Sequence, residues 1–215
     1  SALAVMQTEV KRMLAYSSVS QFGLVIAAFG IANETAVLGG TIHLVGHAIM
    51  KGGLFLAAGV IALSSGARTV EGYRGLARRA PVPAVAFAVL AIAMVGVPPT
   101  VGFLGKWNIV LGAVEGGAWV VVPVLVSSAL LTLAYFGRLL ERMFVAGPLE
   151  DADGAAVTDG GDTAVDDSRL AGDDSPVSIG MIAVVVLSAV LAVALGFAGT
   201  AFESFLEPTL GGLIA

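Results

Sequence analysis

Three ionisable side chains recur at every fourth residue of an otherwise apolar stretch: His43, His47 and Lys51. Four residues turn a helix by only about 40° beyond a full turn, so the three side chains form one polar stripe. A lysine facing lipid at mid-membrane costs roughly 3 kcal/mol even on the milder scales, so the stripe must face other helices or a hydrated cavity. Because histidine and lysine can gain and lose protons, the pattern predicts proton transfer through intervening water.

The alternative for the two histidines is a hydrogen bond between neighbouring helices. The lysine one step further along favours proton transfer instead. A second lysine, Lys106, lies about two helical turns beyond Pro98-Pro99 in V-G-V-P-P-T-V-G-F-L-G-K-W. A lysine near a helix end often reaches for the membrane surface, but the neighbouring proline pair favours a buried functional role.

Gln21, Ser18 and Ser20 are polar residues within another largely apolar stretch, residues 13–32. These side chains either hold water and hydrogen bonds beside the stripe or serve as ordinary helix contacts, and the sequence leaves both open. The chain contains no cysteine, phosphate-binding loop, zinc-protease motif or nucleophile elbow. We therefore expect no enzyme active site, no cofactor, no metal ion and no nucleic-acid partner.

The elements that position these residues belong to a membrane protein, with 57% hydrophobic and 13% charged residues. A bilayer core needs roughly 20 apolar residues as helix, and about five stretches qualify: 13–32, 37–64, 81–113, 118–144 and 178–200. The third should break at Pro98-Pro99, which removes two backbone donors, although a simple kink is the alternative. The sequence thus predicts an all-α polytopic transmembrane bundle with one proline-broken span.

An acidic segment separates the fourth and fifth stretches. Nine of the 16 acidic residues fall between 150 and 174 with one base, Arg169, so this segment carries −8 and the rest of the chain +3. With few large apolar side chains it cannot offset the entropy of ordering, so we expect a disordered linker. The chain then divides into transmembrane helices at 1–145, the acidic linker at 146–177, and the last helix with a tail at 178–215.

The bases indicate orientation. If the spans alternate, nine of the 11 Lys and Arg fall on one side, and the opposite connections near Asn33-Glu34 and Glu115 contain none. The nine are Lys11, Arg12, Arg68, Arg74, Arg78, Arg79, Arg138, Arg142 and Arg169, and the other two are Lys51 and Lys106. The positive-inside rule then places the basic loops and the acidic linker in the cytoplasm. We expect a multi-pass protein of the cell membrane.

Three segments resemble consecutive signatures of the antiporter-like subunits, which are shared by Mrp-type multi-subunit sodium/proton antiporters and the membrane arm of respiratory complex I. They are K-R-M-L-A-Y-S-S-V-S-Q-F-G from Lys11, H-L-V-G-H-A-I-M-K-G-G-L-F from His43, and G-V-P-P-T-V-G-F-L-G-K-W from Gly96. The order and intervals of the three segments fit, and the resemblance covers most of the chain outside the acidic segment.

The resemblance implies a family fold of fourteen transmembrane helices with two inverted five-helix repeats, of which this chain corresponds to the tenth to fourteenth helices, the C-terminal half. It implies that His47 is the central-axis histidine, Lys51 the lysine that follows it, and Lys106 the terminal lysine of the broken helix. Gln21 stands where members have histidine or glutamine. The family's Glu and Lys pair on earlier helices is outside this chain, so we do not expect transport by the chain alone.

Within the family, the H-x-x-x-H-x-x-x-K stripe is taken to disfavour subunit N of complex I and to favour the D-type member of Mrp antiporters or complex I subunits L and M. The leading hypothesis is the C-terminal half of a proton-translocating subunit of a multi-subunit sodium/proton antiporter, working with other subunits, the bilayer, protons and sodium. The first alternative is a non-redox, proton-pumping subunit of a complex I-type oxidoreductase. The second is a structural subunit that transports nothing.

Overall fold

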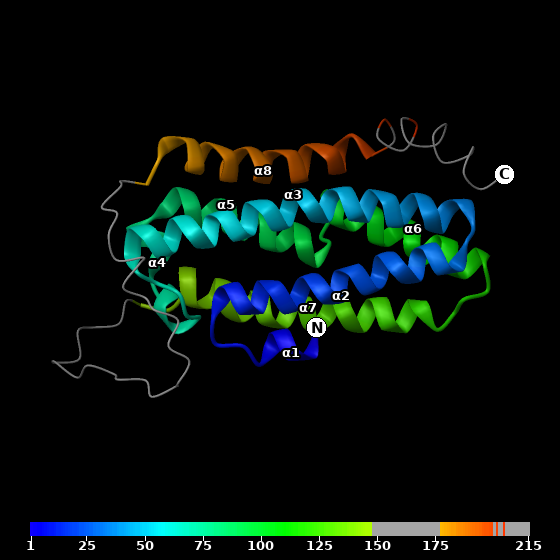
Figure 1. Cartoon of the computed structure of the whole chain (residues 1–215), viewed down its shortest axis with the longest axis horizontal. Coiled ribbons are helices and arrows are strands. Elements are labelled where there is room, and N and C mark those ends of the chain that lie inside the picture. The colour runs from blue at the N-terminus through cyan, green and yellow to red at the C-terminus, as the bar shows by residue number, and fades with distance from the viewer. Residues whose placement is uncertain (148–176, 200, 202–203, 205–215) are drawn as a thin grey trace, which may run out of the picture.

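The structure, a computed structural model, describes residues 1–147, 177–199, 201 and 204, and its long helices lie side by side (Figure 1). The helices are α1 (Ala2–Val5), α2 (Val10–Ile31), α3 (Glu34–Ser65), the 3₁₀ turn η1 (Glu71–Tyr73), α4 (Leu76–Arg79), α5 (Pro81–Val95), α6 (Val101–Glu115), α7 (Val121–Phe144) and α8 (Ile179–Phe197). The expected all-α transmembrane bundle is confirmed.

The expected spans correspond to these helices. By length and composition, α2, α3, α7 and α8 are each able to cross a membrane. The third span is divided between α5 and α6, which have 15 residues each. The short helix α1 precedes the first expected span, and η1 and α4 fall in the connection between the second and third spans.

The break in the third span occurs where the sequence predicts it. Helix α5 ends at Val95 because Gly96 adopts a left-handed φ of 94°, which favours glycine. Pro98-Pro99 follows with a cis peptide bond, and α6 begins after Thr100. A simple kink is therefore wrong, since residues 96–100 separate two distinct helices.

Helix α3 packs against α2, α5, α6 and α8. Its closest approach is to α6, where glycines remove the side chains that would hold the backbones apart. A Cβ placed on Gly105 of α6 would lie 2.8 Å from the Cα of His43, and one on Gly39 of α3 would lie 2.6 Å from the backbone N of Ile109. Small residues permit this close helix packing within a membrane, and it sets α6 directly against His43.

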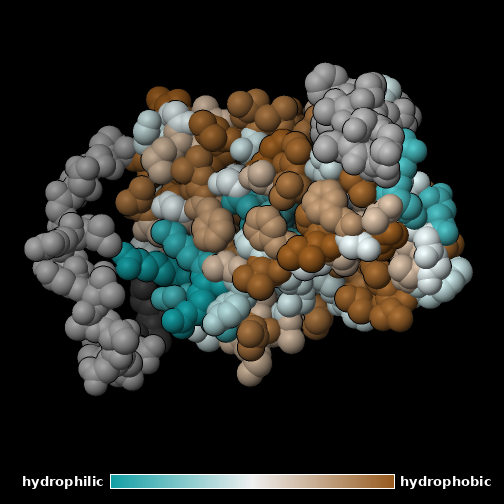
Figure 2. All heavy atoms as spheres, turned by 45° about the vertical axis from the view of Figure 1, so that its right-hand side comes forward, coloured by the Kyte–Doolittle hydropathy of each residue, from teal (hydrophilic) through white to brown (hydrophobic). Residues whose placement is uncertain are grey.

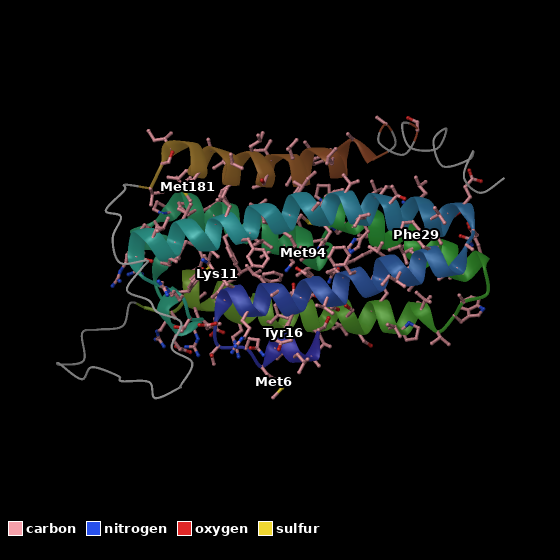
Figure 3. The ribbon with its side chains drawn as sticks, viewed as in Figure 1. Met6, Lys11, Tyr16, Phe29, Met94 and Met181 are labelled. Carbon is pink, nitrogen blue, oxygen red and sulfur yellow. The ribbon has the colours of Figure 1, made fainter. Side chains whose placement is uncertain are left out.

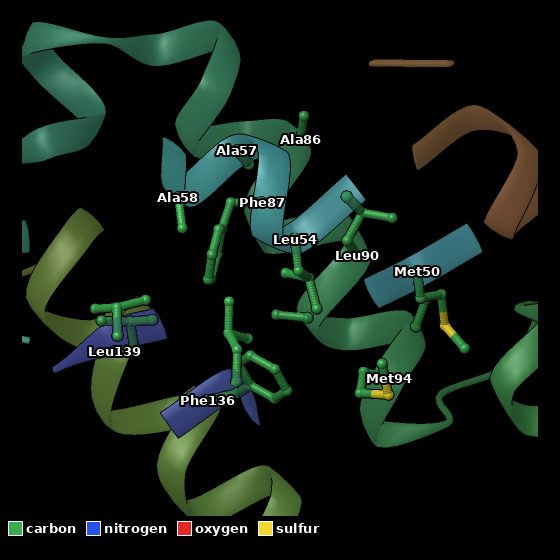
Figure 4. Close-up of a cluster of buried hydrophobic side chains, with 14 of the residues drawn as sticks. Met50, Leu54, Ala57, Ala58, Ala86, Phe87, Leu90, Met94, Phe136 and Leu139 are labelled. Carbon is green, nitrogen blue, oxygen red and sulfur yellow. The ribbon is translucent and has the colours of Figure 1, made fainter. Parts of the chain in front are cut away.

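The apolar core lies mainly among α3, α5 and α7. Figure 4 shows Leu54 of α3 next to Phe87 of α5, with Phe136 of α7 in the same cluster, and the centroids of the two rings are 6.3 Å apart. Large apolar side chains also cover much of the outside, for example Val19 and Ile26 of α2, each 71% exposed. Figure 2 shows hydrophobic side chains over the middle of one face and hydrophilic ones gathered towards the two ends, as a transmembrane bundle requires.

The connections bearing the bases gather at one end of the bundle. Backbone hydrogen bonds join Val10 to Arg68 at 3.0 Å and Gly75 to Arg142 at 3.0 Å. The Glu71 carboxylate lies 3.3 Å from the Arg142 guanidinium and 3.8 Å from that of Arg74. The alternation of the spans is thus consistent with the expected grouping of bases, while the assignment of that end to the cytoplasm stays a prediction.

The acidic linker expected at 146–177 lies outside the described residues except at its two ends. The proposed division of the chain at that linker therefore stays a prediction.

Candidate proton path

Gln21 and His43 form the one direct link, within the described residues, between two of the positions singled out from the sequence. Both side chains are fully buried, and His43 Nε2 lies 3.0 Å from Gln21 Oε1. Since α2 packs against α3, the amide of Gln21 on α2 can hold the imidazole of His43 on α3 in place. The carbonyl accepts from the ring, which fixes a proton on Nε2 in the neutral imidazole.

Lys51 extends the stripe towards the start of α2. Its Nζ donates to the Leu14 carbonyl at 2.8 Å and to the Ser17 hydroxyl, and its side chain is 5% exposed. Ser17 was not among the candidate residues, although Leu14, Ser17 and Gln21 follow one another at helical spacing on α2. The signal that could have found Ser17 is therefore its position four residues before Gln21.

The other two serines named from the sequence do not join the stripe. The Ser18 hydroxyl donates to the Leu14 carbonyl of its own helix at 3.2 Å. The Ser20 hydroxyl lies 2.5 Å from that of Ser1 and 3.2 Å from that of Ser128 on α7. Both are ordinary helix-contact residues here.

His47 lies between the imidazole of His43 and the lysine. It is 4% exposed, its ring centroid is 6.2 Å from that of His43, and Phe22 of α2 packs edge-on against it at 5.4 Å. Nδ1 of both histidines and Nε2 of Gln21 are buried and have no hydrogen-bond partner among the described residues. Buried polar atoms are normally paired, so these three atoms are where water or another polypeptide would bind.

Lys106 lies at the broken helix, as the sequence predicts. Its Nζ donates to the carbonyls of Met94 at 2.7 Å and Val95 at 2.9 Å, the last residues of α5, and Figure 3 labels Met94 in the interior of the bundle. These carbonyls lack the partners that a continuous helix would supply, and the C-terminal end of a helix attracts a cation. The reading of Lys106 as a residue reaching the membrane surface is wrong, because its side chain is only 5% exposed.

The four ionisable residues form one electrostatic group. Lys106 interacts electrostatically with His43 and His47, and Lys51 interacts with His47. Within the described part of the chain every acidic residue lies at a helix end or in a connection: Glu9, Glu34, Glu71, Glu115 and Glu141. Neither lysine is paired with any of them, so both rely on carbonyl and hydroxyl oxygens alone.

No group of three or more metal-binding side chains occurs in the described ranges. The buried nitrogen atoms of the two histidines and two lysines are chemically able to exchange protons.

A buried row of histidine and lysine thus lies beside a broken helix in an all-α transmembrane bundle. The chain belongs to the NADH:quinone oxidoreductase/Mrp antiporter transmembrane family, which it matches over residues 1–132. The resemblance noted from the three sequence segments is thereby confirmed.

Two curated relatives share the N designation. The chain is 44% identical over 147 residues to NADH-quinone oxidoreductase subunit N of Desulforudis audaxviator, covering 68% of this chain and 29% of that protein. It is 36% identical over 158 residues to F(420)H(2) dehydrogenase subunit N of Methanosarcina mazei, covering 69% of this chain and 32% of that protein. The chain thus spans about a third of the length of these relatives.

Solved structures show the same fold. The Mrp complex of Dietzia sp. DQ12-45-1b contains a chain that superposes with a TM-score of 0.78 at 25% identity, covering 95% of this chain and 42% of that one. Respiratory complex I of Thermus thermophilus with bound NADH contains one with a TM-score of 0.71 at 25% identity, covering 99% and 41%.

The preference for the D-type member of Mrp antiporters over complex I subunit N is not supported by these relatives. The stripe of His43, His47 and Lys51 predicts a type other than subunit N, yet both of these curated relatives carry that designation. The stripe alone therefore does not separate the subunit types.

Proposed function

We propose that this chain is part of a proton-translocating membrane-arm subunit of a complex I-type oxidoreductase. Its support is the identity to subunit N proteins of two such enzymes. The observation that carries the proton-handling part is the burial of Lys51 and Lys106, each 5% exposed and without a carboxylate partner in the described part of the chain. A membrane protein retains such residues when they serve transport.

The proposed path runs from Lys51 past His47 and His43 to Lys106. Gln21 orients His43, and Ser17 holds the ammonium group of Lys51. Since no direct hydrogen bond within the described ranges joins the two histidines or either lysine to a histidine, water molecules carry the proton between them. The broken helix supplies the carbonyls that stabilise the charged form of Lys106.

The chain would work within a larger assembly in the cell membrane, surrounded by other subunits and lipid. The relatives are subunits of multi-subunit enzymes, and this chain spans about a third of their length. We place the end that holds Lys11, Arg68 and Arg142 in the cytoplasm by the positive-inside rule. The proposed subunit carries protons and no electrons.

A sodium/proton antiporter is the second candidate, and the TM-score of 0.78 to a chain of the Mrp complex favours it. The two candidates differ in what drives the protons. In the first, quinone reduction drives them. In the second, a sodium gradient drives them.

The test uses the complete assembly in vesicles, with proton movement followed by a pH-sensitive dye. We expect quinone reduction, and not a sodium gradient, to drive proton movement, and Lys51→Ala to abolish it while electron transfer continues. Lys11→Ala is the matched control, because Lys11 is exposed at the start of α2 (Figure 3). Proton movement driven by a sodium gradient would support the antiporter function instead. Unchanged proton pumping in Lys51→Ala would contradict a proton-transfer role for Lys51 and favour a purely structural role for this chain.

A further inference from the structure

An apolar groove of about 680 Å³ runs between the first half of α5 and the middle and last turns of α8. Its lining consists only of proline, valine and alanine, including Pro81, Val85, Ala86, Ala189 and Val190. This groove takes no part in the proton path, whose residues lie on α2, α3 and α6.

Small side chains create the depth of the groove. Ala86 and Ala189 form its floor and are buried, with 5% and 6% exposure. Val82, Val85 and Val190 form its walls and are more than half exposed. The groove is therefore open along its length and offers dispersion contacts but no hydrogen-bonding side chain.

Two exposed cations lie shortly before α5, whose first residue, Pro81, lines the groove. Arg78 and Arg79 occupy the last turn of α4, with only Ala80 between Arg79 and Pro81, and both are exposed. Neither guanidinium has a hydrogen bond or ion pair among the described residues, whereas Arg74, Arg138 and Arg142 all have one. Adjacent guanidinium groups suit a phosphate, which each can bind through two parallel hydrogen bonds.

We infer that the groove between α5 and α8 binds an anionic phospholipid, with an acyl chain against the alanine floor and the phosphate on Arg78 and Arg79. A transmembrane helix from a partner would fill the groove without using either guanidinium group, but an anionic lipid uses both features. Basic residues at a membrane surface attract anionic headgroups, and an apolar groove accepts an acyl chain.

The test uses the complete assembly in phosphatidylcholine vesicles that contain phosphatidylglycerol with a photoactivatable diazirine on its acyl chain. We expect crosslinks on α5 and α8 within the groove. Arg78→Gln with Arg79→Gln should lower crosslinking on the order of 30-fold, because two attractions to an anionic headgroup are lost. Arg12→Gln, which removes an exposed cation at the same end, is the matched control and should change little.

A second pair of variants tests the groove itself. Val190→Trp should fill it and suppress crosslinking, whereas Val184→Trp, at an exposed position on α8 outside the groove, should not. The same diazirine on phosphatidylcholine should label the groove weakly and respond to Val190→Trp but not to the arginine variants. Equal labelling by both lipids, or loss of a partner subunit on Val190→Trp with no lipid crosslink, would overturn the inference.

Discussion

Two buried lysines are held here without any carboxylate among the described residues. Lys51 relies on the Leu14 carbonyl and the Ser17 hydroxyl, and Lys106 on two carbonyls at the end of α5. Neutral oxygens stabilise an ammonium group less than a carboxylate does, and neither lysine is tied to a carboxylate in the part of the chain that the structure describes.

At this scale we predict that Ser17→Ala weakens proton pumping. The variant removes one of the two oxygens bound to Lys51, and a hydrogen bond to a charged group contributes about 1.5–3 kcal/mol. Ser18→Ala is the matched control, because the Ser18 hydroxyl bonds within its own helix. Dye-monitored pumping at equal electron transfer checks both, and equal pumping in the two variants would contradict the role of Ser17.

The sequence was sufficient to single out His43, His47, Lys51 and Lys106, because ionisable residues in apolar surroundings are conspicuous. It was also sufficient to propose Gln21, but not to choose between its two roles. Ser17 and the carbonyls of Met94 and Val95 were missed, since a hydroxyl is unremarkable in a membrane helix and backbone acceptors leave no trace in residue types. Their roles depend on which helices pack together.

At the scale of the elements, the close approach of α6 to α3 sets the geometry of the path. Gly105 lies against the backbone of His43, and the next residue along the chain is Lys106. The break in the third span could be predicted from Pro98-Pro99. The pairing of α3 with α6 could not, because glycines at helical spacing occur on several helices of this chain.

We therefore predict that Gly105→Ala destabilises the bundle by about 1–3 kcal/mol, the usual range for overpacking. The added methyl group meets the α3 backbone at 2.8 Å and pushes α6 away from it. Thermal unfolding of the assembly in detergent measures the effect. Gly59→Ala is the control, because a Cβ there meets nothing within 4 Å, and an equal shift in both variants would refute the packing argument.

At the scale of the whole molecule, the bundle has two distinct ends. The sequence predicts which connections share an end, from the alternation of spans and the placement of the bases. The hydrogen bonds between Val10 and Arg68 and between Gly75 and Arg142 agree with that grouping. The type of subunit could not be predicted, since it depends on similarity along the whole chain rather than on the residues of the path.

We predict that Ser64→Cys is labelled by a membrane-impermeant thiol reagent from the cytoplasmic side only, and Glu115→Cys from the opposite side only. Both positions are exposed at opposite ends of the bundle, and the chain has no cysteine of its own to interfere. Labelling of sealed and inverted vesicles checks this. Labelling of both positions from one side would contradict the alternation of spans.

The claim that Lys51 and Lys106 serve one path is tested most directly by the number of protons pumped per quinone reduced in Lys51→Ala, Lys106→Ala and the double variant. Each single variant should lower that number at least about tenfold, since a proton carrier is lost, and the double variant should fall little further, because a path already interrupted loses nothing more. Wild-type pumping in either single variant, or losses that multiply in the double variant, would contradict a single path.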